Sequence, residues 1–413
     1  MGLPRIRASV YRLRTVASHI VDSLSLGKIV QIRERLFRTA ATGKPVFRLE
    51  SGDPSFEPPA HVIEAMVTAA RAGRTHYVPN AGIPELRVAL RAKAQNENGI
   101  AVASVDNVFV THGAMHALFA GFHVLLDEGD EVIVPDPMWT EVVENIRLAR
   151  GVAIPVPLRR SDAYEYDPGE IERRITPRTR AIFINTPHNP TGAVLSRATL
   201  LAIIEVARRH DLWIVSDEAY EHVIYAPHEH HSVASLAGDW ASRVLTIFSF
   251  SKSHAMAGLR IGALIAHSEL LCQRLQKVLR CSINGVNSLA QWGALAALEG
   301  DTGHHAVMLA EYERRRDVLV GALDGIAGVR TFMPRGTFFA WIELEAALYE
   351  RLGVATADDI SELLCREGVG NTPGDAFGAG SADAMRFSFS CDTAMVAAGS
   401  QILRRVLLGR DPA

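Results

Sequence analysis

The sequence predicts an α/β fold in which a mainly parallel sheet lies between helices, with a smaller α+β domain beside it. The first observation behind this prediction is an alternation of short apolar runs with stretches of helical periodicity between residues 60 and 300. The second is the length of 413 residues, which suggests two or three domains, and a hydrophobic content of 48 %, which is enough for a sizeable core.

The apolar runs that we expect to be strands are short and rich in Val, Ile, Leu and Phe. They cover residues 107–111, 131–135, 181–185, 212–216, 244–249 and 261–266. Apolar residues recur at helical spacing through residues 200–207, which predicts a helix in one of the connections between strands. This order of elements is typical of a parallel sheet covered on both faces.

We predict three parts along the chain: an N-terminal arm that contributes to the small domain (residues 1–58), a large domain (59–305) and a small C-terminal domain (306–413). The net charge of −3 offers no electrostatic basis for binding nucleic acid. No apolar run approaches membrane-spanning length and the start lacks a secretory core, so we expect a cytoplasmic protein without a membrane partner.

The run Ser249-Phe250-Ser251-Lys252 closes one of the expected strands, and Arg260 follows eight residues after the lysine. A lysine at the end of a buried strand is costly unless its amine has a task. Forming a Schiff base with a carbonyl cofactor is such a task, because a desolvated lysine loses its proton and becomes a nucleophile. Ser249 and Arg260 offer a neutral donor and a fork-shaped cation, which suit a phosphate. The alternative is an exposed lysine at a strand end.

Two further segments favour the cofactor interpretation. Asp217 follows the expected strand 212–216, and the carboxyl ends of parallel strands are where ligands bind in open α/β sheets. Its carboxylate could hold a protonated ring nitrogen, although Asp217 by itself could also be a helix cap or a salt-bridge partner. A turn with two X-Pro steps can project Asn189 from a fixed position, and Asn189 and Tyr220 could donate to a phenolate oxygen.

With these segments in this order, the chain resembles the class I/II aminotransferases of the fold-type I pyridoxal-phosphate enzymes, the aspartate aminotransferase superfamily. The resemblance extends from about residue 46 to about residue 390, and it implies a seven-stranded sheet and pyridoxal 5'-phosphate as the cofactor. The matching motifs are Leu49-Glu50-Ser51-Gly52-Asp53-Pro54, Tyr77, Gly82, Glu85-Leu86-Arg87, Gly113-Ala114-Met115-His116-Ala117, Gly129-Asp130-Glu131-Val132, Asn189-Pro190-Thr191-Gly192, Asp217-Glu218-Ala219-Tyr220, Ser249 to Lys252, Gly258-Leu259-Arg260 and Met385-Arg386-Phe387-Ser388.

The resemblance implies catalytic roles for Lys252, Asp217 and Tyr220. Lys252 would hold the cofactor as an aldimine and then act as the base that moves the substrate proton. Asp217 would keep the ring nitrogen protonated, and Tyr220 would tune the imine. In this interpretation the enzyme moves an amino group between an α-amino acid and an α-keto acid by a ping-pong mechanism, as in amino acid biosynthesis.

The resemblance also implies further cofactor contacts. The helix that is expected to start after Gly113 would present the N–H groups of Ala114 and Met115 to the phosphate. Trp139 would stack on the pyridine ring, with plain core packing as the alternative. Tyr77 would reach across the interface of a homodimer to the neighbouring phosphate, with a surface tyrosine as the alternative.

The substrate would be held mainly by Arg386, which matches the residue that grips the α-carboxylate, assisted by Asn189 and the Gly52 backbone. A structural salt bridge is the alternative for Arg386. No second arginine can be matched to a side-chain carboxylate. The predicted pocket is largely neutral, which favours neutral or aromatic amino acids. Its residues would be Met115, Trp139, Phe338, Phe339 and the segment 24–26.

Other interpretations remain open at this point. Carbon–sulfur β-lyases, decarboxylases, racemases and oxidases share these motifs, because the cofactor carries the chemistry. A transcription regulator that has adopted the fold would need a DNA-binding domain in front, and the residues before Phe47 show no helix-turn-helix pattern. The histidines of His228-Glu229-His230-His231 have no second ligand cluster, so we expect no metal. His254, two residues after Lys252, differs from the small or aromatic residues usual in the family and receives no role.

Overall fold

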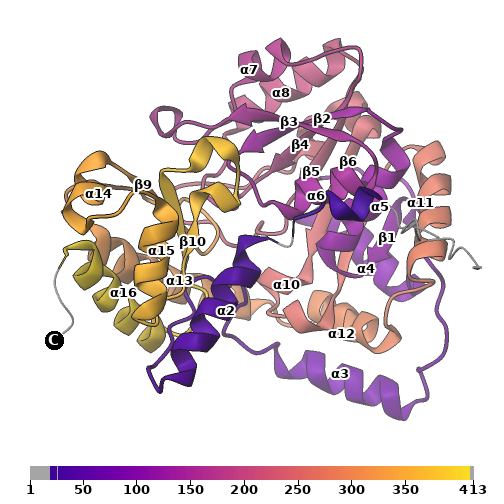
Figure 1. The fold of residues 1–413 in the computed structure, drawn as a ribbon. Helices are drawn as coiled ribbons and strands as arrows, with labels where there is room; N and C mark the ends of the chain where they lie inside the picture. The colour runs from indigo at the N-terminus through magenta and orange to yellow at the C-terminus, as the bar shows by residue number, and fades with distance from the viewer. Residues whose placement is uncertain (1–18, 26, 410–413) are drawn as a thin grey trace, which may run out of the picture.

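Two β-sheets organise the chain in the computed structural model, which describes residues 19–25 and 27–409 (Figure 1). The strands of the large sheet are β1 (Val108–Thr111), β2 (Glu131–Asp136), β3 (Val152–Pro157), β4 (Thr179–Asn185), β5 (Trp213–Asp217), β6 (Val244–Ser249) and β7 (Gly262–Ala266). Those of the small sheet are β8 (Val329–Phe332), β9 (Phe339–Leu344), β10 (Thr372–Pro373) and β11 (Ala384–Ser388). A seven-stranded sheet with a second, smaller α+β layer is thus confirmed.

The large sheet has the order β1-β7-β6-β5-β4-β2-β3 and is mainly parallel. Only β7 runs against its neighbours, pairing antiparallel with both β1 and β6. Six strands agree with the predicted ones to within two residues at each end, but β3 was not predicted. This strand contains Pro155 and Pro157, which have no backbone N–H to donate to a neighbouring strand. The two prolines are tolerated because β3 lies at the edge of the sheet and pairs with β2.

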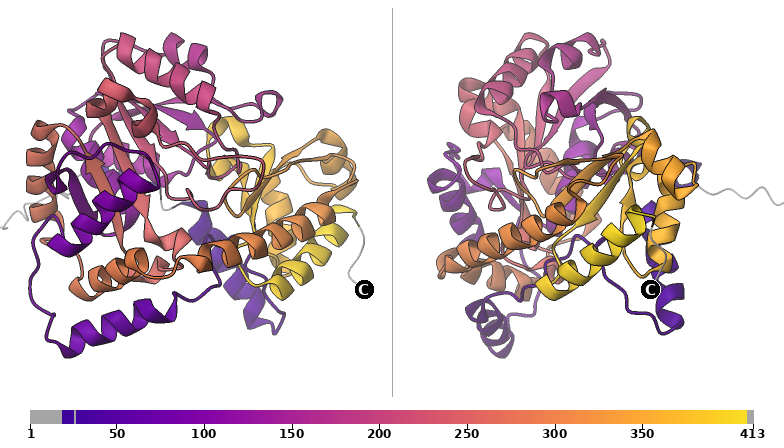
Figure 2. Two further views of the ribbon diagram at one scale, coloured as in Figure 1. Left: turned by 180° about the vertical axis from the view of Figure 1, so that it is seen from behind. Right: turned by 90° about the vertical axis from the view of Figure 1, so that its left-hand side faces the viewer.

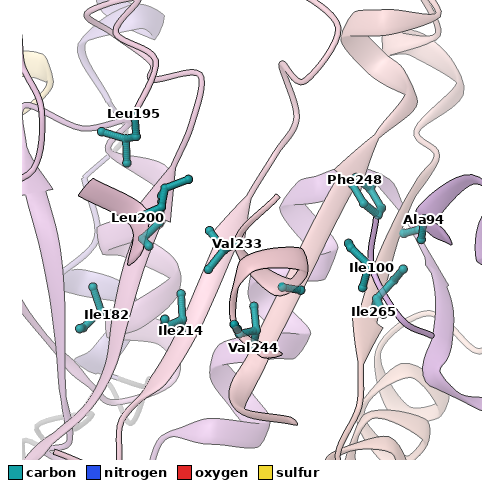
Figure 3. Close-up of a cluster of buried hydrophobic side chains, with 14 of the residues drawn as sticks. Ala94, Ile100, Ile182, Leu195, Leu200, Ile214, Val233, Val244, Phe248 and Ile265 are labelled. Carbon is teal, nitrogen blue, oxygen red and sulfur yellow. The ribbon is translucent and has the colours of Figure 1, made fainter. Parts of the chain in front are cut away.

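Helices cover both faces of the large sheet, because successive side chains of a strand point to opposite faces. In β4, Ile182 faces one buried cluster and Phe183 faces the other. Figure 3 shows the first cluster, where Ile182 and Ile214 of neighbouring strands lie near Leu200 of a covering helix. The helices that contribute to this cluster are α3 (Ala60–Arg71), α4 (Pro84–Asn96), α7 (Pro168–Arg173), α8 (Arg197–Arg209), α9 (Val233–Leu236), α10 (Phe250–Ser253) and α12 (Ser288–Glu299). Those of the second are α5 (Gly113–Leu125), α6 (Glu141–Leu148) and α11 (Glu269–Ser282).

The small sheet has the order β10-β11-β9-β8 and its own hydrophobic core. Its helices are α13 (Gly303–Leu323), α14 (Ala346–Leu352), α15 (Ala357–Arg366) and α16 (Thr393–Leu407). The 21-residue α13 runs from the neighbourhood of α12 toward the small sheet, as the orange helix of Figure 2 shows. It therefore links the two layers. The domain boundaries at residues 58 and 305 stay a prediction.

The N-terminal segment joins the small layer, as predicted. After the short α1 (His19–Asp22), helix α2 (Lys28–Ala41) packs Ile32 and Leu36 against Cys365 of α15, and the two helices lie side by side in Figure 1. Phe47 then pairs with Val369 in an isolated parallel bridge. The chain thus returns from α2 to the point where the two sheets meet. No helix of the described segments is long and apolar enough to span a bilayer.

Candidate active site

A cavity of about 250 Å³ lies where the two sheets meet, at the carboxyl ends of β4, β5 and β6. Parallel strands end at the same edge of a sheet, so their last residues converge there. Most of the predicted site residues line it: Gly52, Ala114, Met115, Trp139, Asn189, Asp217, Tyr220, Ser249, Lys252, Arg260 and Arg386. Of the remaining two, Gly113 packs behind the wall of the cavity, and Tyr77 lies on the surface with 93 % of its area exposed.

Lys252 stands in the four-residue helix α10 (Phe250–Ser253), directly after β6. Ser249 caps this helix, its Oγ accepting from the N–H of Ser251 at 3.2 Å. The Lys252 Nζ donates to the carbonyl oxygen of Gly52 at 2.6 Å, and burial lowers the pKa of its amine to about 8. No carboxylate of the described residues lies within ion-pair distance of this amine. Lys252 can therefore exist as a neutral amine close to physiological pH.

Asp217 is the last residue of β5, and its side chain is buried. Its Oδ1 accepts from the N–H of Ala219 at 3.1 Å, and burial raises the pKa of the carboxyl group to about 6. Asn185, the last residue of β4, donates through Nδ2 to the Asp217 carbonyl at 3.1 Å and accepts from the Asn189 N–H at 2.8 Å. Asn185 thus ties Asn189 to the two strand ends. Asn185 was not predicted from the sequence, although a polar residue ending a buried strand was a usable signal.

The N-terminus of α5 forms one end of the cavity. No side chain of the described residues caps this helix, so its first N–H groups are available to a ligand. The guanidinium of Arg260 lies against Gly113, where an added Cβ would come within 2.6 Å of Nη2. Arg260 is held there by donating from Nη1 to the carbonyl of Ala257 at 2.9 Å. Free helix N–H groups beside a guanidinium make an anion-binding site.

Arg386 enters the cavity from β11 of the small sheet and is only 2 % exposed. Its Nη1 donates to Oδ1 of Asn189 at 3.0 Å, and its Nη2 donates to the carbonyl of Glu50 at 2.9 Å. The guanidinium lies 4.2 Å from the ring centre of Phe339, and burial lowers its pKa to about 10. No carboxylate of the described residues pairs with it, so a structural salt bridge is not what holds Arg386.

The lining of the cavity differs from the predicted substrate pocket. Met115, Trp139 and Phe339 do line it, but Phe338 packs behind, with its ring 5.4 Å from that of Tyr220.

Helix α2 lines the cavity in place of the segment 24–26. Residues 24 and 25 do not line the cavity, and Leu26 lies outside the described residues. Instead α2 contributes Ile29 and the exposed Arg33 at the mouth. The prediction was wrong for residues 24 and 25 because the docking of α2 depends on contacts with α15, more than 300 residues away along the chain.

Comparison with known proteins identifies the family. Residues 44–402 match the family described as aminotransferase class I and II. The chain belongs to this family. This aminotransferase is 35 % identical, over 95 % of its length and 83 % of the relative, to a bifunctional aspartate aminotransferase and glutamate/aspartate-prephenate aminotransferase of Petunia hybrida.

Solved structures of the same family superpose closely on this aminotransferase. An aspartate aminotransferase from Thermus thermophilus with maleate has a TM-score of 0.88 at 32 % identity, covering 94 % of this chain and 99 % of the other. An aromatic aminotransferase from Pyrococcus horikoshii has a TM-score of 0.83 at 33 % identity, and the match covers 90 % of this chain and 98 % of the other. Resemblance, fold class and enzyme class are thereby confirmed, and a lyase, decarboxylase, racemase or oxidase activity is not favoured.

The histidine-rich loop of this aminotransferase is tied to a buried acid. Nε2 of His230 lies 3.0 Å from Oε2 of Glu218, a carboxylate that is fully buried. The same oxygen accepts from Ser232 Oγ at 2.7 Å. His230 therefore has a structural partner, separate from the active-site cavity.

Proposed function

We propose that this aminotransferase moves an amino group between an α-amino acid and an α-keto acid, in two half-reactions that use pyridoxal 5'-phosphate. One observation carries the proposal: the Lys252 amine and the Arg386 guanidinium reach one cavity, and neither has a carboxylate partner among the described residues. Burying an unpaired cation is unfavourable. A bound amino acid would bring a carboxylate to Arg386 and an amine to the neighbourhood of Lys252.

The groups around the cavity fit pyridoxal 5'-phosphate. The uncapped N-terminus of α5 and the guanidinium of Arg260 suit its phosphate, and the carboxylate of Asp217 suits a protonated ring nitrogen. The residues that we propose for the cofactor are Gly113, Ala114, Met115, Trp139, Asn189, Asp217, Tyr220, Ser249, Lys252 and Arg260, with Tyr77 from a second copy of the chain.

When bound, this cofactor supplies an aldehyde that condenses with amines and a ring that withdraws electrons. Lys252 Nζ, whose pKa burial lowers to about 8, is neutral often enough near neutral pH to take the proton from the substrate Cα. Asp217 places a negative charge at the end of β5 that would hold a proton on the ring nitrogen. Arg386 would orient the substrate through its α-carboxylate, with Asn189 and the Gly52 backbone assisting, so that Cα faces the amine.

We propose neutral or aromatic amino acids as the preferred substrates. Met115 and Trp139 support this preference, because they add apolar surface where the substrate side chain would lie. Arg33 at the mouth is the feature that would suit an acidic side chain instead. Comparing kcat/KM for phenylalanine, methionine and aspartate decides the matter. A strong preference for aspartate would overturn the proposal and direct attention to Arg33.

We propose a homodimer as the active unit. Tyr77 is a large, almost fully exposed aromatic residue, which suits an interface better than solvent. Light scattering should give the mass of two chains, and Tyr77→Ala should weaken cofactor binding without altering the fold. A fully active monomer would contradict this assignment. The cytoplasmic location stays a prediction.

The absorption spectrum of the purified protein tests the reaction itself. We expect a cofactor band that shifts when a donor amino acid is added and returns when a keto acid follows. Formation of ammonia and pyruvate from a cysteine-type substrate, without any keto acid acceptor, would instead indicate a lyase.

A further inference from the structure

Three histidine side chains from two separate segments converge beside the helix that carries Lys252. His254 directly follows α10, while His304 and His305 lie in the first turn of α13. Nδ1 of His254 is 3.2 Å from Nε2 of His304 and 3.4 Å from Nε2 of His305. One ring nitrogen from each of the three histidines lies within 4.8 Å of the other two. The active-site chemistry proposed above uses none of these groups.

The three histidines cannot satisfy one another by hydrogen bonding. Nδ1 of His304 lies 3.3 Å from the carbonyl of Asp301, which accepts a hydrogen bond and so places the His304 proton on Nδ1. The lone pair of Nε2 then points at His254. The single facing nitrogen of His254 carries either one proton or one lone pair, so it can pair with only one of its two neighbours. At least one nitrogen of the cluster is left without a partner inside the cluster.

Two of the three nitrogen–nitrogen distances in the cluster match those of a transition-metal site, and the third is within 4.8 Å. Zinc–imidazole bonds of about 2.0–2.1 Å in a tetrahedral site separate ligand nitrogens by roughly 3.3 Å. The two nitrogen–nitrogen distances from His254 are 3.2 and 3.4 Å. The Asp301 carbonyl on the far nitrogen of His304 is the kind of outer contact that orients metal-bound histidines. His254 is buried, while His304 and His305 are half-buried, so an ion can enter from the solvent side.

The charges around the cluster are compatible with a cation. Lys93 adds a nearby positive charge, but it is paired with Glu221. The rings of His222 and His305 are stacked, with their centroids 4.3 Å apart. Nε2 of His222 lies 3.8 Å from a carboxylate oxygen of Glu97 and 3.8 Å from one of Glu221. The two carboxylates of Glu97 and Glu221 and the one ammonium group of Lys93 together give a net negative charge next to the cluster.

We propose that His254, His304 and His305 bind one divalent transition-metal ion of the zinc and nickel class, with a fourth position open to water. Imidazole nitrogens select such ions over magnesium or calcium, which prefer oxygen ligands. The ion would join the end of α10 to the first turn of α13, and so connect the segment that carries Lys252 to the helix leading into the small sheet. This site is independent of transamination, and its presence or absence does not bear on the proposed function. It revises the expectation of no metal, which considered only the loop of His228 to His231.

Calorimetric titration of the holoenzyme with ZnCl₂, and with MgCl₂ as a non-binding control, tests the proposal. We expect one saturable zinc per chain, a melting temperature raised by zinc but not by magnesium, and a loss of affinity of at least about 100-fold in His304→Ala/His305→Ala. The matched control is His228→Ala/His231→Ala, which also removes two histidines and should bind zinc as the wild type does. Absence of saturable zinc binding, or an equal loss in the control variant, would overturn the site.

Two further measurements keep the test informative where the double variant fails to fold. His254→Phe supplies an aromatic residue of the kind usual in the family at this position, and it should fold and lose zinc affinity to the same extent. Cobalt(II) added to the wild-type holoenzyme should give the intense visible bands of a tetrahedral nitrogen site. Unchanged zinc affinity in His254→Phe, or only the weak absorption of octahedral cobalt, would show that the cluster does not bind metal in this way.

Discussion

Two lysines with enclosed amines illustrate how differently this protein treats a buried positive charge. Lys93, on α4, is 7 % exposed and donates to Glu221 at 2.5 Å and to Asn98 at 2.7 Å. Among the described residues, Lys252 on α10 donates only to the Gly52 carbonyl, and burial lowers the pKa of its amine to about 8. Within the described part of the chain, Lys93 has an anionic partner and Lys252 has none.

The difference separates a structural charge from a functional one. Burial by itself would raise the pKa of Glu221, but the attraction of Lys93 and the nearby histidines outweighs it and lowers this pKa to about 2, so the Glu221 carboxylate is ionised near neutral pH. Lys252 and Arg386, which have no carboxylate partner in residues 19–25 and 27–409, face the cavity, where a bound ligand can pair with them. Perturbed groups in a cavity are typical of functional sites.

Lys252→Ala should remove the functional charge and leave the structural one intact. Because the amine is the proposed attachment point and base, transamination should fall by at least about 10⁴-fold, while the urea unfolding midpoint should not decrease. Steady-state kinetics and a urea titration measure the two effects. Transamination that survives in this variant would remove Lys252 from the mechanism.

Lys93→Met should produce the opposite result. Leaving Glu221 buried without its partner should reduce the free energy of unfolding by about 3–5 kcal/mol, while the activity per folded molecule is retained. Urea unfolding measures the loss. The double variant Lys93→Met/Glu221→Met serves as the control and should recover most of the stability. A single variant as stable as the wild type would show that the pair is not structural.

Arg386→Lys extends the comparison to the second cation that faces the cavity. A lysine keeps the charge but loses the forked geometry, so kcat/KM for amino acids should fall by about 10- to 100-fold with the fold unchanged. Steady-state kinetics with one donor and one acceptor checks this. An unchanged kcat/KM would indicate that the α-carboxylate binds elsewhere.

A weaker contrast concerns the pH dependence of two buried carboxylates. The folded-state pKa of Glu221, about 2, lies below its ordinary value, so its contribution to stability is present above pH 4.5 and is lost as the pH falls toward 2. The folded-state pKa of Asp217, about 6, lies above its ordinary value of 3.8, so ionising it destabilises the cofactor-free fold as the pH rises through 6.

These signs are checked by urea unfolding of cofactor-free protein at several pH values. At pH 7, Glu221→Gln should be less stable than the wild type and Asp217→Asn more stable, and both differences should shrink in acid. Effects of the same sign for the two variants would contradict the assignment of one carboxylate to the fold and the other to the cofactor.

The large sheet could be predicted in most of its strands from the sequence, because buried parallel strands are continuous apolar runs that local composition identifies. The edge strand β3 was not predicted, because a segment with Pro155 and Pro157 is typical of a loop. Prolines fit a strand only where one of its sides has no hydrogen-bonded neighbour, and the local sequence does not show that. Asp217 and Lys252 were identifiable for the same local reason: each is a polar residue at the carboxyl end of such a run.

Local sequence was therefore enough to identify the strands along the chain, the positions of their polar ends and the family, because these depend on neighbouring residues. Tertiary packing determines which residues far apart in the sequence come into contact. Arg386 reaches Asn189 across 197 positions, and α2 brings Arg33 to the mouth of the cavity. His254 meets His304 across 50 positions. Such contacts depend on how the two sheets and their helices dock, and no local periodicity records that packing.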